Sequence, residues 1–161
     1  MQTTLLERSE KEYIRSALDE IMTDMGYVLV GGREHVAKRT GRKTRHALYK
    51  VTGGVAVDVT YAENGQISME LGGLDGTDRT PTPAEAESLA SDMRAFCGDY
   101  REFVRRLREK GILIDEIGHL PPEPQYAQII NTNDYDLNRP VETYSAAAHR
   151  HAADSAKHVG E

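Results

Sequence analysis

Apolar residues recur at helical spacing near the start of the chain. Ser9 followed three residues later by Glu12 forms a capping-box pattern, and Gly26 stands where a helix commonly ends. Between them the apolar positions fall on one stripe: Ile14, Ala17, Leu18, Ile21, Met22 and Met25. We therefore expect a first helix from Ser9 to Met25, followed by a short strand over residues 27 to 30.

The pattern changes to strict alternation from Thr44 onward. Ala47, Tyr49 and Val51 share one face of a strand, and after Gly53-Gly54 the residues from Val55 to Tyr61 alternate again. Asn64-Gly65 is a typical hairpin turn, and a third alternating run follows it up to residue 71. The sequence predicts a three-stranded antiparallel meander with one apolar and one polar face, so that only one face needs a cover.

A second helix has a complete start signal. Thr82 suits the N-cap, Pro83 the first helical position and Glu85 the third, and the apolar stripe continues to Gly111. This spacing predicts a helix of about 27 residues, roughly 40 Å long, which is longer than a short sheet is wide. After it we expect a short strand over residues 112 to 114 and an edge strand over 126 to 130.

These elements predict an α+β fold. Its architecture is a two-layer sandwich, in which an antiparallel sheet of four to six strands with a central meander carries two helices on one face. We expect residues 1 to 137 to form a single domain. Residues 138 to 161 are rich in Ala and His, and we expect them to be a flexible tail or one ordered by a partner.

Composition argues against several classes of protein. The chain has 161 residues and no run of roughly 20 apolar residues, so a membrane span is not expected. Residues 1 to 12 contain acids and lack the apolar core of a signal peptide, which favours a cytoplasmic location. The single cysteine, Cys97, has no partner for an internal disulfide.

The charge distribution is uneven. The net charge is −6, yet residues 33 to 50 hold seven Lys and Arg against one Glu. This local charge of +6 leaves −12 for the rest of the chain. We take seven residues as candidate binding residues: Arg33, Lys38, Arg39, Arg42, Lys43, Arg45 and Lys50. His35, His46 and Tyr49 are interleaved with them.

Catalytic signals are weak by comparison. The common phosphate-loop, dinucleotide, zincin and hydrolase-elbow motifs are missing, so no cofactor and no catalytic residue is assigned. Asp58, Glu70 and Asp75 with Lys50 could form a metal-dependent hydrolase site if they converged. In the tail, His151, Asp154 and His158 would share a helical face, but we expect a polar tail rather than a metal site.

Three functional hypotheses follow. The favoured one is a small non-enzymatic binding or accessory protein that contacts a protein partner through its basic loop and long amphipathic helix. The alternative is a nucleic-acid-binding protein that uses residues 33 to 50, and the third is a metal-dependent hydrolase. Self-association into a homo-oligomer is left open by the sequence.

Overall fold

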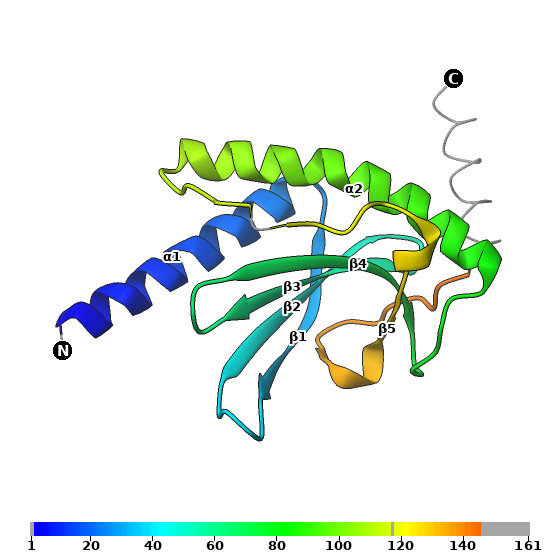
Figure 1. The fold of residues 1–161 in the computed structure, drawn as a ribbon, viewed down its shortest axis with the longest axis horizontal. Coiled ribbons are helices and arrows are strands. Elements are labelled where there is room, and N and C mark those ends of the chain that lie inside the picture. The colour runs from blue at the N-terminus through cyan, green and yellow to red at the C-terminus, as the bar shows by residue number, and fades with distance from the viewer. Residues whose placement is uncertain (1, 117, 146–161) are drawn as a thin grey trace.

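The fold is α+β, as the sequence predicts. A computed structural model describes residues 2–116 and 118–145. It contains one six-stranded sheet, and the helices α1 (Gln2–Asp24) and α2 (Pro83–Glu109) pack on the same face of that sheet (Figure 1). The layer arrangement of the predicted sandwich is therefore confirmed.

The sheet is a meander with one short strand added at each edge. The predicted antiparallel meander is confirmed and extended by one strand, because the strand expected over residues 27 to 30 runs on to residue 36 and pairs with its neighbour. The sheet order is β5-β4-β3-β2-β1-β6. Its strands are β1 (Val28–Val36), β2 (Lys43–Thr52), β3 (Val55–Ala62), β4 (Ile67–Asp75), β5 (Ile129–Asn131) and β6 (Asp136–Leu137). Only β5 pairs in parallel, with β4, so the sheet is mixed rather than wholly antiparallel.

The main core lies between the helices and the sheet. Leu18 of α1 and Phe103 of α2 are fully buried against Val57 and its neighbours on the strands. Each helix also accepts one hydrogen bond from the hydroxyl of a tyrosine. The Tyr49 hydroxyl donates to Asp19 Oδ1 of α1 at 2.6 Å, and the Tyr27 hydroxyl donates to Asp99 Oδ2 of α2 at 2.7 Å. The helices are thus fixed by both packing and polar contacts.

The two helices differ in how well the sequence predicts their starts. The expected N-cap at Ser9 is wrong, because α1 begins at Gln2 and continues through Ser9. The start of α2 is confirmed. Glu85 N donates to Thr82 Oγ1 at 3.2 Å, and Thr82 N donates to Glu85 Oε1 at 2.9 Å, which completes the capping box. The helix has the predicted 27 residues.

The prediction of a strand over residues 112 to 114 is wrong. This stretch lies outside the sheet, whose edge beyond β4 is taken by β5. Ile112 and Ile114 pack against the main core, while Leu113 between them is 79% exposed. The alternation of inward and outward residues therefore arises because one side of an extended segment packs on the core, and not because the segment pairs as a strand. This segment runs back alongside α2 in Figure 1.

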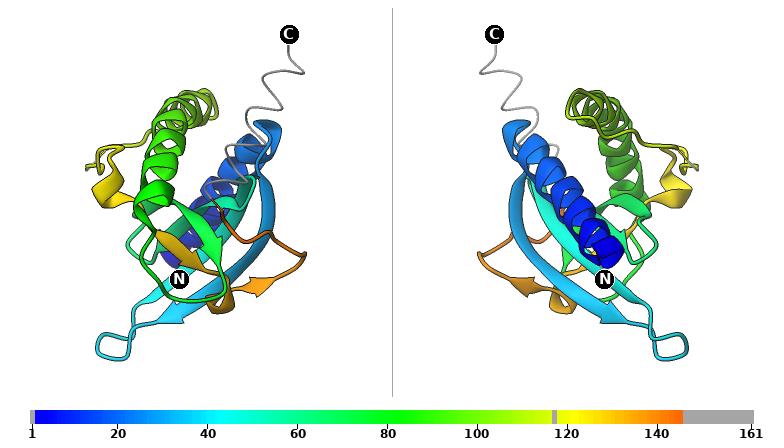
Figure 2. Two further views of the ribbon diagram at one scale, coloured as in Figure 1. Left: turned by 90° about the vertical axis from the view of Figure 1, so that its right-hand side faces the viewer. Right: turned by 90° about the vertical axis from the view of Figure 1, so that its left-hand side faces the viewer.

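The second face of the sheet is also covered, so the expectation that only one face needs a cover is wrong. Val30, Leu48, Ala56, Leu74 and Ile130 form a separate buried cluster there. Residues 129 to 145, here called the C-terminal strap, begin in β5 at one edge of the sheet and pass through β6 at the other (Figure 2). Tyr135 and Val141 of the strap pack against this cluster.

The strap requires the sheet to curl. Asn131 ends β5 and Asp136 begins β6. The five Cα-to-Cα steps from one position to the other reach at most about 17 Å, whereas the strand spacings from one edge of a flat six-stranded sheet to the other amount to about 24 Å. The curl seen in Figure 2 shortens that path.

The end of the strap is held in a glycine notch. A Cβ added to Gly73 would lie 2.7 Å from Tyr144 Cγ, and one added to Gly54 would lie 2.8 Å from Tyr144 Cα. Tyr144 N donates to Leu74 O at 2.7 Å, and the residue is 2% exposed. Residues 138 to 145 of the expected tail thus contact the domain, and its remainder, residues 146 to 161, lies outside the described residues.

The α2 capping box generates a pH-dependent prediction. Arg79 donates to both carboxylate oxygens of Glu85, at 2.7 and 2.9 Å. This ion pair and the Thr82 amide lower the pKa of Glu85 from 4.5 to about 2. The stabilisation is therefore present above the unfolded pKa and is lost as the pH falls towards 2.

We expect Glu85→Gln to lower the free energy of unfolding by about 1–3 kcal/mol at pH 7, measured by urea denaturation. The difference from wild type should shrink below pH 4.5. Glu87→Gln is the control, because Glu87 is exposed on the same helix, and it should change stability by less than about 0.5 kcal/mol. A difference that stays constant down to low pH would contradict this account of the α2 start.

Candidate anion-binding surface

The hairpin of β1 and β2 extends beyond the rest of the sheet. Figure 2 shows its loop projecting away from the helices and from the strap. Ala37 N donates to Arg42 O at 2.9 Å, and Gly41 N donates to Ala37 O at 2.8 Å. Gly41 has a φ of +67°, which a glycine adopts without strain. The loop is therefore closed by its own backbone, and its side chains are left for solvent.

Five of the seven predicted binding residues gather on this hairpin. All five are exposed, and within the described part of the chain none of them forms an ion pair. Glu34 faces Arg45 in the strand register, but these two side chains also form no ion pair. We call this set the basic arm: Lys38, Arg39, Arg42, Lys43 and Arg45.

The structure places the other two predicted residues elsewhere. The Arg33 guanidinium lies over the ring of Tyr135 in the strap, 5.2 Å from its centroid. Arg33 is half-buried and belongs to the strap-covered face. Lys50 lies near the opposite end of β2 from the hairpin loop, paired with Val28 of β1. Neither residue therefore contributes to the basic arm.

A polar cluster beneath the strap was not anticipated from the sequence. His46 Nδ1 lies 3.0 Å from Asp58 Oδ2 and 3.1 Å from Thr60 Oγ1. Asp58 is only 7% exposed. Tyr135 of the strap packs edge-on against the His46 ring, and burial followed by the nearby Asp58 charge raises the pKa of Tyr135. Strap and sheet are therefore joined here by polar contacts.

This cluster has part of the connectivity of a catalytic triad. His46 Nε2 lies 3.3 Å from Thr44 Oγ1, so Asp58, His46 and Thr44 are linked in the order of acid, base and nucleophile. However, the Thr44 contact is long for a hydrogen bond, and neither His46 nor Asp58 lines the cavity between the ends of α1 and α2 or the cavity between α1 and the hairpin. We assign the cluster the role of holding the strap.

The carboxylates considered for a hydrolase have separate partners. Asp58 bonds to His46, Glu70 accepts from Gln128 Nε2 at 3.2 Å, and Asp75 pairs with Arg79 at 2.5 Å. Across the residues that the structure describes, no group of three His, Cys, Asp or Glu side chains is placed to hold a metal ion. The tail residues His151, Asp154 and His158 lie outside the described residues.

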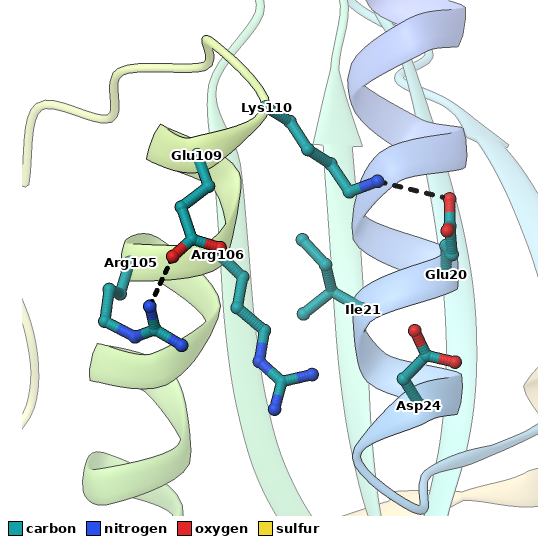
Figure 3. Close-up of a pocket in the computed structure, with 7 residues that line it drawn as sticks. All are labelled: Glu20, Ile21, Asp24, Arg105, Arg106, Glu109 and Lys110. Atoms are coloured by element: carbon teal, nitrogen blue, oxygen red, sulfur yellow. Dashed lines mark hydrogen bonds and ion pairs between the residues drawn. The ribbon is translucent and has the colours of Figure 1, made fainter.

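A second charged region is neutralised by its own neighbours. A cavity of about 350 Å³ lies between the C-terminal ends of α1 and α2. Lys110 pairs with Glu20 at 3.4 Å, and Arg105 pairs with Glu109 at 2.5 Å (Figure 3). Arg106 pairs with Glu102 at 2.9 Å. The cations of this cleft are thus matched by acids, in contrast to those of the basic arm.

Comparisons of the chain with protein families, curated proteins and solved structures found no match. Among the helices of the described residues, none is both long and apolar enough to cross a membrane.

The different environments of Arg33 and Arg39 generate a prediction. Arg33→Ala removes a half-buried guanidinium from the Tyr135 ring and should lower the free energy of unfolding by about 0.5–2 kcal/mol. Arg39→Ala is the matched control on the exposed loop and should change it by less than about 0.5 kcal/mol. Chemical denaturation of both variants measures this, and equal effects would contradict the separate placement of the two arginines.

Proposed function

We propose that this protein is a binding protein that holds an acidic segment of a protein partner on its basic arm. The observation that carries the proposal is the set of exposed cations, Lys38 to Arg45, none of which has an ion pair within the described residues. Clustered cations of one sign raise the local concentration of an anionic ligand and speed its association.

The unpaired state of the arm is informative because acids are abundant elsewhere. Residues outside 33 to 50 carry a net charge of −12. Two arginines of α2 are paired with such acids, Arg105 with Glu102 and Glu109 and Arg106 with Glu102. The hairpin loop extends away from α2 (Figure 2). An anion from another molecule can therefore approach the arm without first displacing an internal partner.

An acidic protein segment fits this surface better than nucleic acid does. Single-stranded nucleic acids are commonly held by stacking of bases on exposed aromatic side chains. Tyr49 is 1% exposed and bonded to Asp19, and His46 lies beneath the strap, which leaves only His35 exposed among the interleaved rings. A long phosphate chain would also meet the acidic remainder of the molecule.

The long helix does not enter the proposal. Phe103 and Leu107 on its apolar stripe are fully buried in the main core. Its outward surface is charged and in part paired internally, as Arg105 shows. The basic arm is thus the surface best suited to contact a partner.

The test uses a labelled acidic peptide, acetyl-Asp-Glu-Asp-Ala-Glu-Asp-Glu-amide, and fluorescence anisotropy at low salt, about 50 mM. We expect the double variant Arg39→Glu/Arg42→Glu to weaken binding by at least about tenfold, because two attractive contacts become repulsive. Wild type should also bind the peptide more tightly than it binds an oligothymidylate of equal charge.

The matched control is Arg101→Glu/Arg108→Glu, which makes the same change of net charge at two exposed positions of α2. We expect this control to weaken binding less than threefold, about the effect of long-range screened charge. Equal losses in both double variants would contradict a specific role of the arm. Tighter binding of the oligothymidylate would instead support the nucleic-acid hypothesis.

A further inference from the structure

A cavity lies at the base of the basic arm, on the helix-covered side of the hairpin. It has a volume of about 240 Å³ and lies between α1 and the ends of β2, β3 and β4 nearest the arm. Lys43 and Arg45 of the basic arm belong to its wall. The arm and the cavity therefore form one continuous surface.

The cavity combines an apolar interior with a cationic rim. Ile14, Tyr61 and Ile67 lie in its wall and are half-buried, and Tyr61 and Ile67 pack against the main core. Four of its lining residues are Lys or Arg, against two Glu. Arg15 lies with its guanidinium 5.9 Å from the centre of the Tyr61 ring. A ligand that complements this wall has an apolar group next to negative charge.

The hydroxyl of Tyr61 adds a polar feature to the wall. It is buried, and the structure gives it no hydrogen-bond partner within the described residues. Burial raises the pKa of Tyr61 to about 12, so the hydroxyl keeps its proton at neutral pH and remains a donor. A buried donor without an acceptor is unfavourable, and a carbonyl or carboxylate oxygen of a ligand would remove that penalty.

We propose that this cavity receives one large apolar side chain of the acidic segment, whose neighbouring acidic residues contact Lys43 and Arg45. The inference rests on the proposed function and adds the partner's recognition pattern, an apolar anchor flanked by Asp or Glu. The cavity volume of about 240 Å³ is below the roughly 300–1,000 Å³ of typical small-molecule pockets, which favours a single side chain. Buried apolar anchors surrounded by polar contacts are common at protein interfaces.

The test compares two peptides that differ only at the centre. One is the alanine peptide of the preceding test, and the other carries phenylalanine in place of the alanine. Wild type should bind the phenylalanine peptide about tenfold more tightly, the scale expected for burial of one large apolar side chain. Ile14→Ala should reduce that ratio to less than about threefold, because it removes part of the cavity wall.

Two controls accompany this comparison. Ile114→Ala shortens another half-buried isoleucine, which packs against the main core and does not line the cavity, so it should preserve the ratio. Tyr61→Phe removes only the hydroxyl and should weaken binding of both peptides by a few-fold, about the effect of one lost hydrogen bond.

The outcomes separate this inference from the proposed function. If both peptides bind wild type equally and both are weakened by Arg39→Glu/Arg42→Glu, the arm binds acidic segments and the anchor in the cavity is refuted. If Ile114→Ala lowers the ratio as much as Ile14→Ala does, the cavity assignment is likewise refuted. If neither peptide binds, the proposed function fails and the inference fails with it.

Discussion

Burial of both faces of the β2–β3 strand pair is the constraint on which the rest of the structure depends. Tyr49 and Val57 face the helices, whereas Leu48 and Ala56 face the opposite side, and all four are at most 1% exposed. Two helices cover the first face and the C-terminal strap covers the second. The sheet must curl because its two edge strands, β5 and β6, are joined by a short connection. The glycine notch at Gly54 and Gly73 then holds the end of the strap through Tyr144.

This double cover determines what remains on the surface. The strap crosses the sheet, and the hairpin of β1 and β2 extends beyond the strap with its cations in solvent. In the cleft between the helices, by contrast, Arg105 and Lys110 are paired with neighbouring acids. The basic arm and the cavity at its base therefore combine unpaired charge with accessible apolar surface. That combination is the physical basis for proposing an acidic, apolar-anchored segment as the ligand.

Local signals predicted the parts of the fold that depend on local chemistry. The meander and the start of α2 follow from alternation, hairpin turns and the Thr82–Glu85 capping box. The predictions that failed concern segments whose structure depends on packing against distant parts of the chain. The strap could not be predicted because it joins Leu48 to residues 82 to 93 positions further along the chain, and no local pattern encodes such contacts. Ile112 and Ile114 alternate because one side packs on the core.

The candidate site was predictable to a similar extent. Charge counting identified the segment that carries the arm, but it could not separate Arg39, which is exposed, from Arg33, which packs on Tyr135. The alternation of side chains along the strands could have separated the two arginines. Arg33 pairs with His46, and both lie on the face that the strap covers. The measurement that tests the central claim most directly is an NMR titration of the ¹⁵N-labelled protein with the phenylalanine-centred acidic peptide. The account predicts amide shift changes confined to residues 38 to 45 and the surroundings of Ile14, Tyr61 and Ile67. Changes concentrated on α2 or the strap, with none at the arm, would contradict it.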